Sequence, residues 1–132
     1  MRLKRIRDYG TAKVVVRGVR HYNGLALSPR RVMARPHFAI SVNGQLAGWI
    51  GYELRRPHVY EIAHLSVRPR FRRRGLAETA VGRVLFLVRR AGGRHVYARI
   101  RRTNYASQGL FRKCAFRRVS RGRRFYRFAR GL

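Results

Sequence analysis

The stretch RPRFRRRGLA, residues 68–77, places five arginines among its first seven residues and then reaches a glycine. The extended run HVYEIAHLSV, residues 58–67, comes before it, and Pro69 stops that run. A helical pattern begins directly after Gly75, and the first N–H groups of a helix have no intrahelical acceptors. The stretch therefore predicts a phosphate-binding bend between a strand and a helix. The alternative is that these arginines are only part of the solvated surface of a very basic protein.

The charge balance of the whole chain favours a polyanionic partner. Among 132 residues, 33 Lys and Arg oppose 4 Asp and Glu, which gives a formal net charge of +29. Such self-repulsion destabilises a compact monomer unless something anionic offsets it. All but three of the basic residues are arginine, whose planar fork binds phosphate bidentately. We therefore expect DNA, RNA or a nucleoprotein as partner. The alternative is a codon bias, which could replace lysine by arginine but would not explain why Asp and Glu are so few.

Length and cysteine content bound the class of protein. The chain is long enough for one domain, 1–132, with a single core. Cys114 is the only cysteine, which excludes an internal disulfide and fits a reducing compartment. The five histidines show no metal-ligand spacing, so no metal site is predicted. No stretch has the length and apolarity of a signal peptide or a membrane span, so we expect a soluble, cytoplasmic protein without a membrane partner.

Hydrophobic periodicity predicts a mixed α/β order. The strongest local signal is Asn43-Gly44, a type I′ turn that joins two alternating runs into a hairpin. The predicted elements are a strand over 12–19, a turn-rich segment with one short helix over 20–36, the hairpin from 37 to 54, a strand over 58–67, a helix from 76 to 90, a strand over 95–100, a helix over 104–115, and two terminal strands around Arg121-Gly122. We expect helices packed on one twisted sheet.

Two stretches resemble the GCN5-related N-acetyltransferase (GNAT) superfamily. SVRPRFRRRGLA is similar to its acetyl-CoA signature, an apolar strand end, a proline, an aromatic residue and R/Q-x-x-G-x-G/A, carried here by Val67, Pro69, Phe71, Arg72, Gly75 and Ala77. NYASQGLFRKCAF, residues 104–116, looks like a later helix of the family, with matches at Asn104, Ser107, Leu110, Lys113 and Phe116. The resemblance covers residues 37–130 well. It implies a GNAT-like acyl-CoA N-acyltransferase fold, a mixed central sheet flanked by helices, with a shortened N-terminal helical region.

The resemblance also implies acetyl-CoA as cofactor and a set of residues that bind it. In the family, backbone N–H groups of the bend wrap the coenzyme diphosphate, which here implies Arg72, Arg73, Arg74, Gly75, Leu76 and Ala77. The preceding strand pairs with the pantetheine arm, which maps to Leu65 and Val67, and its N–H groups would hold the acetyl carbonyl. The match on the later helix adds Asn104 and Phe111 to the coenzyme set.

Glu61 is the candidate catalytic residue. It lies six residues before Val67, where many members of the family, histone acetyltransferases among them, place a glutamate general base. Acetyl transfer to an amine requires that the ammonium first lose a proton, which a carboxylate can take through water. The alternative is a strand acid neutralised by neighbouring arginines, which would lower its pKa and weaken it as a base.

The sequence departs from the family pattern at three places. Phe111 stands where the family has the tyrosine that protonates the departing thiolate, and loss of a general acid costs about 10²–10⁴-fold in rate. Tyr105 is six residues earlier and on a different face of the helix, so it is a poor substitute. Ala115 replaces the glycine that ends this helix in a left-handed conformation. About 17 residues, 20–36, connect the first two predicted strands, so we expect an open, shallow acceptor site suited to a macromolecule.

Two functions of different class remain open. The first is an acetyl-CoA-dependent N-acetyltransferase that acts on an amine presented by a nucleic acid or a nucleoprotein, favoured by the bend and Glu61. The second is a GNAT-fold structural or nucleic-acid-binding component of a nucleoprotein particle, a ribosome or a virion, favoured by the departures. Under either, arginines interleaved with aromatic residues near the C-terminus are the candidate nucleic-acid contacts. They are Arg99, Arg101, Arg102, Arg117, Arg118, Arg121, Arg123 and Arg124.

Overall fold

The computed structural model describes residues 1–132 and contains one seven-stranded mixed sheet in the order β1-β2-β3-β4-β5-β7-β6. Its strands are β1 (Arg2–Arg5), β2 (His37–Val42), β3 (Gln45–Arg56), β4 (Val59–Val67), β5 (His95–Arg101), β6 (Arg117–Arg121) and β7 (Phe125–Gly131). Its helices are α1 (Tyr9–Gly18), a π-helical turn η1 (Val19–Asn23), α2 (Pro29–Ala34), a 3₁₀ turn η2 (Pro69–Phe71), α3 (Leu76–Arg90) and α4 (Tyr105–Lys113). Only β4 and β5 are parallel neighbours.

The predicted order is confirmed from residue 37 onward. Asn43 and Gly44 have φ angles of 50° and 77°, as a type I′ turn requires at both central positions. The helix predicted after Gly75 runs to Arg90, and Asn104 caps α4 by accepting a hydrogen bond from the Ser107 N–H at 3.1 Å. Local turn and cap chemistry was therefore sufficient for these elements.

The strand predicted over 12–19 is wrong, because most of these residues form α1. Asp8 caps this helix, and its carboxylate accepts from the Thr11 N–H at 2.7 Å. The valine run favours a strand locally, but burial of one helical face outweighs that preference. Fully buried residues on this face are Ala12, Val15 and Val19. The first strand is β1, so residues 6–36, two helices and the π turn, connect the first two strands instead of the short 20–36 segment.

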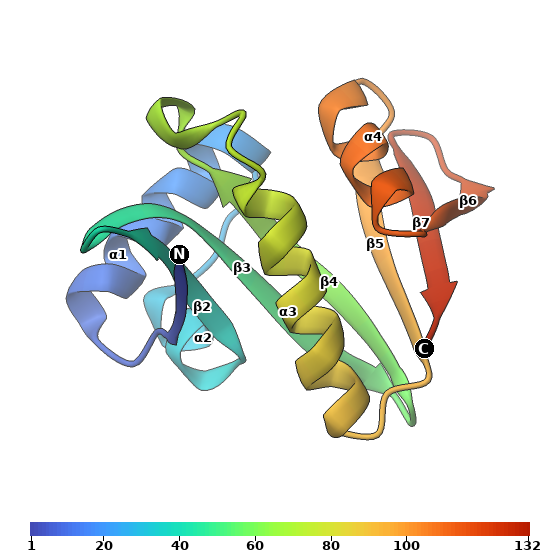
Figure 1. The fold of residues 1–132 in the computed structure, drawn as a ribbon, viewed down its shortest axis with the longest axis horizontal. Helices are drawn as coiled ribbons and strands as arrows, with labels where there is room; N and C mark the ends of the chain where they lie inside the picture. Colours follow the sequence, from blue (N-terminus) through green and yellow to red (C-terminus); the bar gives the residue numbers. More distant parts are fainter.

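Apolar side chains pack on both faces of the sheet, α1 and α2 on one and α3 and α4 on the other (Figure 1). The cluster beneath α1 and α2 surrounds Trp49 of β3, which is 1% exposed. The larger cluster lies beneath α3 and α4 and includes Ile50, Ile62, Val84, Ile100, Phe111 and Phe128. None of the helices combines the length and the apolar composition that a membrane-spanning segment needs.

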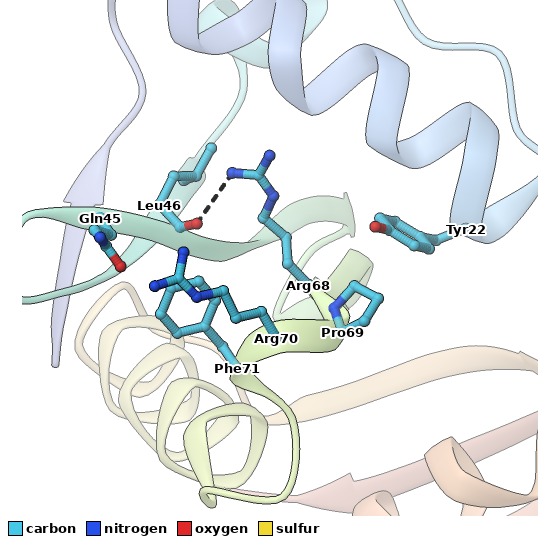
Figure 2. A pocket seen from close by; sticks show the side chains of 7 residues that line it. All are labelled: Tyr22, Gln45, Leu46, Arg68, Pro69, Arg70 and Phe71. Atoms are coloured by element: carbon cyan, nitrogen blue, oxygen red, sulfur yellow. Dashed lines mark hydrogen bonds between the residues drawn. The ribbon is translucent and has the colours of Figure 1, made fainter.

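The bend from β4 to α3 is anchored to β3 (Figure 2). The Arg68 guanidinium donates to the Leu46 carbonyl at 3.1 Å, and the Arg68 N–H donates to the Ala47 carbonyl at 2.7 Å. The ring of Phe71 belongs to the larger core cluster and is 6% exposed. One buried ring and two hydrogen bonds therefore fix where α3 begins.

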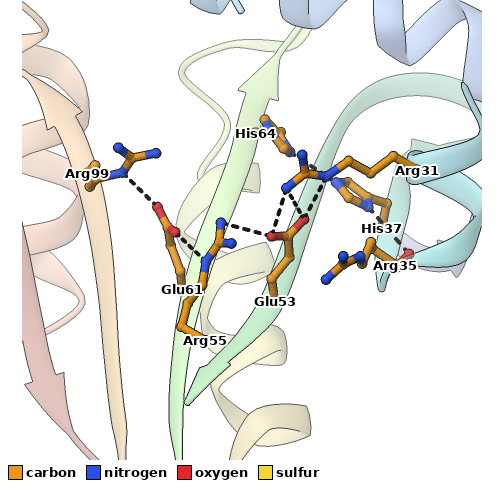
Figure 3. Close-up of polar contacts among 8 residues, drawn as sticks. All are labelled: Arg31, Arg35, His37, Glu53, Arg55, Glu61, His64 and Arg99. Carbon is orange, nitrogen blue, oxygen red and sulfur yellow. Dashed lines mark hydrogen bonds and ion pairs between the residues drawn. The ribbon is translucent and has the colours of Figure 1, made fainter. Parts of the chain in front are cut away.

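A polar cluster lies on the face of β2, β3 and β4 opposite α3 (Figure 3). The Glu53 side chain is fully buried and pairs with Arg31 at 3.2 Å and with Arg55 at 2.8 Å. Burial alone would raise the pKa of Glu53, but the charges of Arg55 and Arg31 outweigh it and lower the pKa. Next to it, the fully buried His37 places its Nε2 at 3.0 Å from Nδ1 of His64. Burial, and secondarily the neighbouring His64, lowers the pKa of His37 to about 4.

Substitution of Gly18 tests the contact between α1 and the sheet. A Cβ atom on Gly18 would overlap the Trp49 indole, so we expect Gly18→Ala to lower the free energy of unfolding by about 1–3 kcal/mol. The matched control is Gly82→Ala in α3, where a Cβ atom meets nothing within 4 Å and helix propensity should add up to about 1 kcal/mol. Urea denaturation measures both, and stabilisation by both substitutions would contradict this packing.

Stability should fall on mild acidification because His37 is buried as a neutral ring. Its folded pKa of about 4 lies below the unfolded value of 6.5, so the unfolded chain binds more protons between these values. Stability attributable to His37 is complete above about pH 6.5 and decreases toward pH 4, by about 3 kcal/mol in total. Urea unfolding should decline less over this range in His37→Gln than in the wild type. Parallel curves for the two proteins would refute the assignment.

Candidate active site

β4 and β5 form a fork, because they pair only at their beginnings. The parallel ladder joins Val59–Glu61 to His95–Tyr97 and ends there, although β4 continues to Val67 and β5 to Arg101 (Figure 1). On its other side β4 remains paired to β3 as far as Val67, with an irregularity where His64 adopts a positive φ of 59°. The edge of β4 that faces β5 is therefore open over residues 62–67.

Six consecutive N–H groups at the end of this fork have no acceptor in the protein. Gly75 precedes α3 with a left-handed φ of 73°, and α3 has no side-chain cap. Thr79 is the first residue of this segment whose N–H is hydrogen-bonded, and it donates to the Gly75 carbonyl at 3.1 Å. The N–H groups of residues 73–78 are thus all available to an anion.

A cavity of about 450 Å³ adjoins these N–H groups, between the start of α3 and one face of α4. From the bend it is lined by Val67, Phe71, Arg72, Arg73, Gly75, Leu76, Ala77 and Glu78. From α4 it is lined by Tyr105, Ala106, Gly109, Leu110 and Lys113. The cavity thus brings together six residues of the coenzyme set expected from sequence: Val67, Arg72, Arg73, Gly75, Leu76 and Ala77.

The arginine side chains of the bend bind mostly to the protein itself. Nε of Arg72 donates to the Val67 carbonyl at 2.8 Å, and its guanidinium lies over the Tyr22 ring at 5.4 Å. Arg70 and Arg74 both lie over the ring of Phe71. Arg73 lines the cavity with its backbone in the left-handed region, at a φ of 63°. The bend therefore leaves its backbone N–H groups unbonded, while most of its guanidinium groups contact the bend itself or the neighbouring Tyr22.

Four expected coenzyme residues do not line the cavity: Leu65, Arg74, Asn104 and Phe111. The Leu65 side chain packs against the larger core cluster, although its backbone lies on the open edge of β4. Asn104 is the cap of α4. Phe111 is 4% exposed and packs edge-on against Phe116, with ring centroids 5.0 Å apart.

Helix α4 contributes residues that the motif comparison did not select. Tyr105 is 76% exposed and lines the cavity, whereas sequence reasoning had set it aside as a substitute acid. Ala106 and Gly109, which are small, line the cavity beside Tyr105 and leave room next to the bend. The sequence signal for this lining was the four-residue spacing of Tyr105, Gly109 and Lys113, which puts them on one face of the helix. At the end of α4, Ala115 has a φ of 67°, so the left-handed corner persists without glycine, at a cost of about 1–2 kcal/mol.

Glu61 lies at the root of the fork, in the last residue pair between β4 and β5. It is 5% exposed, and each carboxylate oxygen accepts a hydrogen bond from an arginine (Figure 3). Nε of Arg55 donates to Oε1 at 2.8 Å, and Nε of Arg99 donates to Oε2 at 3.1 Å. The arginine neighbours considered in the sequence alternative are therefore present, and a substrate proton would have to compete with these two bonds.

The candidate nucleic-acid arginines are all exposed but do not share one surface. The strand pairing puts Arg99, Arg101 and Arg117 on one face of the sheet and Arg118 and Arg121 on the other. The remaining three, Arg102, Arg123 and Arg124, lie in the connections between elements.

Solved structures of acetyltransferases share this fold at low identity. Ard1 from Thermoplasma volcanium superposes with a TM-score of 0.86 and 16% identity, over 99% of this chain and 97% of that one. PaiA N-acetyltransferase from Thermoplasma acidophilum, solved in complex with coenzyme A, gives a TM-score of 0.83 at 12% identity, over 99% and 98%. Ribosomal-protein-alanine N-acetyltransferase from Brucella melitensis gives 0.77 at 17% identity, over 100% of both chains. A sequence search of curated proteins finds no significant match.

The sequence itself identifies the family. A family model described as acetyltransferase (GNAT) family matches residues 16–116, which include the fork, the bend and all of α4. The donor that goes with this family is acetyl-CoA, and the unpaired N–H groups beside the cavity suit its diphosphate. The chain belongs to the GNAT family of acetyltransferases.

Proposed function

We propose that the protein is an acetyl-CoA-dependent N-acetyltransferase whose acceptor amine is presented by a nucleic acid or a nucleoprotein. The observation that carries the catalytic part is the run of free N–H groups over residues 73–78 beside a cavity of about 450 Å³. Such a backbone nest binds a diphosphate without any side-chain charge, and the α3 dipole adds to it. Arg72, Arg73 and Lys113 line the same cavity and are its cationic side chains.

The open edge of β4 would hold the rest of the donor. Acetyl-CoA supplies the acetyl group as a thioester, whose carbonyl carbon is open to attack by an amine. Main-chain groups of residues 62–67 face the fork and have no ladder to β5, so they are free to pair with the pantetheine arm. N–H groups at Leu65 and Val67 would stabilise negative charge on a carbonyl oxygen placed between the strands.

Glu61 is the proposed proton acceptor. Its carboxylate lies where the strands separate, and Arg55 and Arg99 fix its position from both sides. A proton from the acceptor amine would reach it through water, which suits a side chain that is 5% exposed. With Phe111 buried and unable to donate a proton, water is the proposed source of the proton for the leaving thiolate.

The nature of the acceptor follows from charge. A formal net charge of +29 repels free polyamines and other cationic amines, and it attracts amines carried on a polyanion. The single cysteine supports a cytoplasmic location, where a nucleoprotein particle could be the target. The second candidate, a structural component of a nucleoprotein particle without turnover, is favoured by Phe111 and by the paired state of Glu61.

Substitution of Gly75 tests the diphosphate site. A side chain at a φ of 73° costs about 1–2 kcal/mol in the left-handed conformation, so the bend of Gly75→Ala should relax and misalign its N–H groups. We expect coenzyme A affinity, measured by calorimetry, to fall about tenfold or more. Gly92→Ala is the matched control, because Gly92 has a φ of 94° and open space but lies at the far end of α3. Equal affinity losses in both variants would exclude a specific site at the bend.

Substitution of Glu61 separates the enzyme from the structural component. Glu61→Gln keeps the shape but removes the base, so we expect the rate of acetyl transfer to fall about 10²–10⁴-fold with coenzyme A affinity unchanged. Transfer is measured from radiolabelled acetyl-CoA to purified ribosomes and to protein-free RNA. The control is Glu53→Gln, which loses a carboxylate paired with the same Arg55 but one strand away from the fork. The catalytic proposal would be overturned if the wild type left both ribosomes and RNA unlabelled, or if Glu61→Gln kept full activity.

A further inference from the structure

We infer that one bare face of β5, β7 and β6 binds single-stranded nucleic acid and leads it toward the fork. The inference deepens the proposed function: the idea that the bound strand carries the acceptor amine rests on that function. Binding of nucleic acid to the face can be measured separately.

The face lies on the α1 side of the sheet, and the helical layer meets it only at its edge, where the Arg101 guanidinium donates to the Asn23 carbonyl of η1 at 3.1 Å. Helices α1 and α2 lie over β2 and β3, while β5, β7 and β6 extend beyond them (Figure 1). The apolar cluster on that side takes no residue from these three strands. Its members, with those packed against it, are Ile6, Ala12, Val15, Val16, Val19, Leu27, Val32, Met33, Ala39 and Trp49. The three strands therefore bury one face, toward α4 and the core, and leave the other open.

Strand alternation determines which side chains occupy the open face. Val96, Ala98 and Ile100 of β5 are buried in the main core, so the residues between them point the other way. The register carries this alternation to β7, where Phe128 is buried opposite Ala98, and on to β6. The open face therefore carries Tyr97, Arg99 and Arg101 of β5, Phe125 and Arg127 of β7, and Arg117 of β6.

Arginine and aromatic side chains are stacked in pairs on this face. The Arg127 guanidinium lies over the Tyr97 ring at 4.2 Å, and Arg101 lies over the Phe125 ring at 5.4 Å. Beside Tyr97 the surface is hollowed by about 520 Å³, and arginines surround the hollow. Its lining includes Arg56, Tyr97, Arg117, Val119, Arg127 and Arg130. Stacked pairs of this kind offer a base a flat surface and a phosphate a fork of donors at the same place.

The charge of the face selects a polyanion. No Asp or Glu follows Glu78 in the chain, so β5, β6 and β7 contain no acid at all. The one carboxylate at its border, Glu61, is 5% exposed and already paired with Arg55 and Arg99. An acidic protein could satisfy this charge, but it would make no use of the half-buried aromatic rings and the guanidinium planes stacked on them.

The aromatic planes favour a single strand over a duplex. Bases in a duplex are stacked on one another and present only their edges, whereas a single strand can place successive bases on rings and guanidinium planes. An open strand face also lacks the projecting helix or loop that a groove would receive. Arg99 connects this face to the site, because its Nε donates to Glu61 while its guanidinium lies 5.8 Å from the Phe125 ring centroid. A strand bound on the face would therefore pass the root of the fork.

The test compares two triple variants that lose the same charge. One replaces three arginines that line the hollow, each by Gln: Arg117 and Arg127 of the bare face, and Arg56 at the adjoining end of β3. The other replaces Arg83, Arg89 and Arg90 by Gln on exposed positions of α3, on the opposite side of the sheet. Anisotropy titrations use labelled oligouridine, oligothymidine and a DNA duplex, all of about 12 nucleotides or base pairs, over a range of KCl concentrations.

For the face variant we expect a loss of affinity for both single strands of at least about tenfold, and a decrease of about 2 in the slope of log affinity against log salt. The α3 variant should keep most of its affinity. Tyr97→Leu should weaken single-strand binding about tenfold and leave the salt slope unchanged, because it removes stacking and no charge. Wild-type affinity should be higher for single strands than for the duplex.

Equal losses in the two triple variants would overturn the inference, because binding would then follow net charge alone. A preference for the duplex, or unchanged binding in Tyr97→Leu, would overturn it as well. Coenzyme A affinity of each variant reports whether the fold survives. Gly75→Ala separates the two proposals, because this variant should lose coenzyme A affinity and keep oligonucleotide binding. A face variant that loses oligonucleotide binding but keeps coenzyme A affinity leaves the acetyltransferase proposal intact.

Discussion

The separation of β4 from β5 is the constraint on which the site depends. Parallel strands that stayed paired to their ends would satisfy the backbone of residues 62–67 and close the space between them. Here the ladder ends at Glu61, and the bend at Pro69 turns the chain into α3 with six N–H groups unbonded. The residues that carry these groups are exposed or half-buried, so water can satisfy the N–H groups and an anion could replace that water.

The arginines of this protein have two separate roles. Within the bend, four of the five pack on Phe71 or Tyr22 or bond to main-chain carbonyls, so they hold the backbone nest in shape. On β5, β6 and β7 they lie on exposed strands, several of them over aromatic rings. Arginines are exposed in both regions, but those of the bend lie within one short segment, whereas those of the second region are spread over three strands.

The two acidic residues of the sheet, Glu53 and Glu61, are opposite each other on β3 and β4 and share Arg55. Each would be destabilising if buried alone, and the arginines of α2, β3 and β5 offset that cost. This network connects the helical layer to the fork. It keeps Glu61 in one position, so the proposed base would act through a water molecule and would not move to its substrate.

The sequence by itself determined the bend, the hairpin, α3, β5 and the cap of α4, because proline, Asn-Gly, glycine and an N-cap asparagine act through their immediate neighbours. It also determined the family, since the spacing of residues 66–77 and 104–116 is local. Only the tertiary structure decided that residues 12–19 are helical, because burial of Ala12, Val15 and Val19 against Trp49 overrides the strand preference of valine. It alone decided that Phe111 is buried, that Tyr105 lines the cavity, and which arginines share a face. Those outcomes depend on contacts between strands and helices far apart in the chain, and the only local signal among them is the helical spacing of Tyr105 to Lys113.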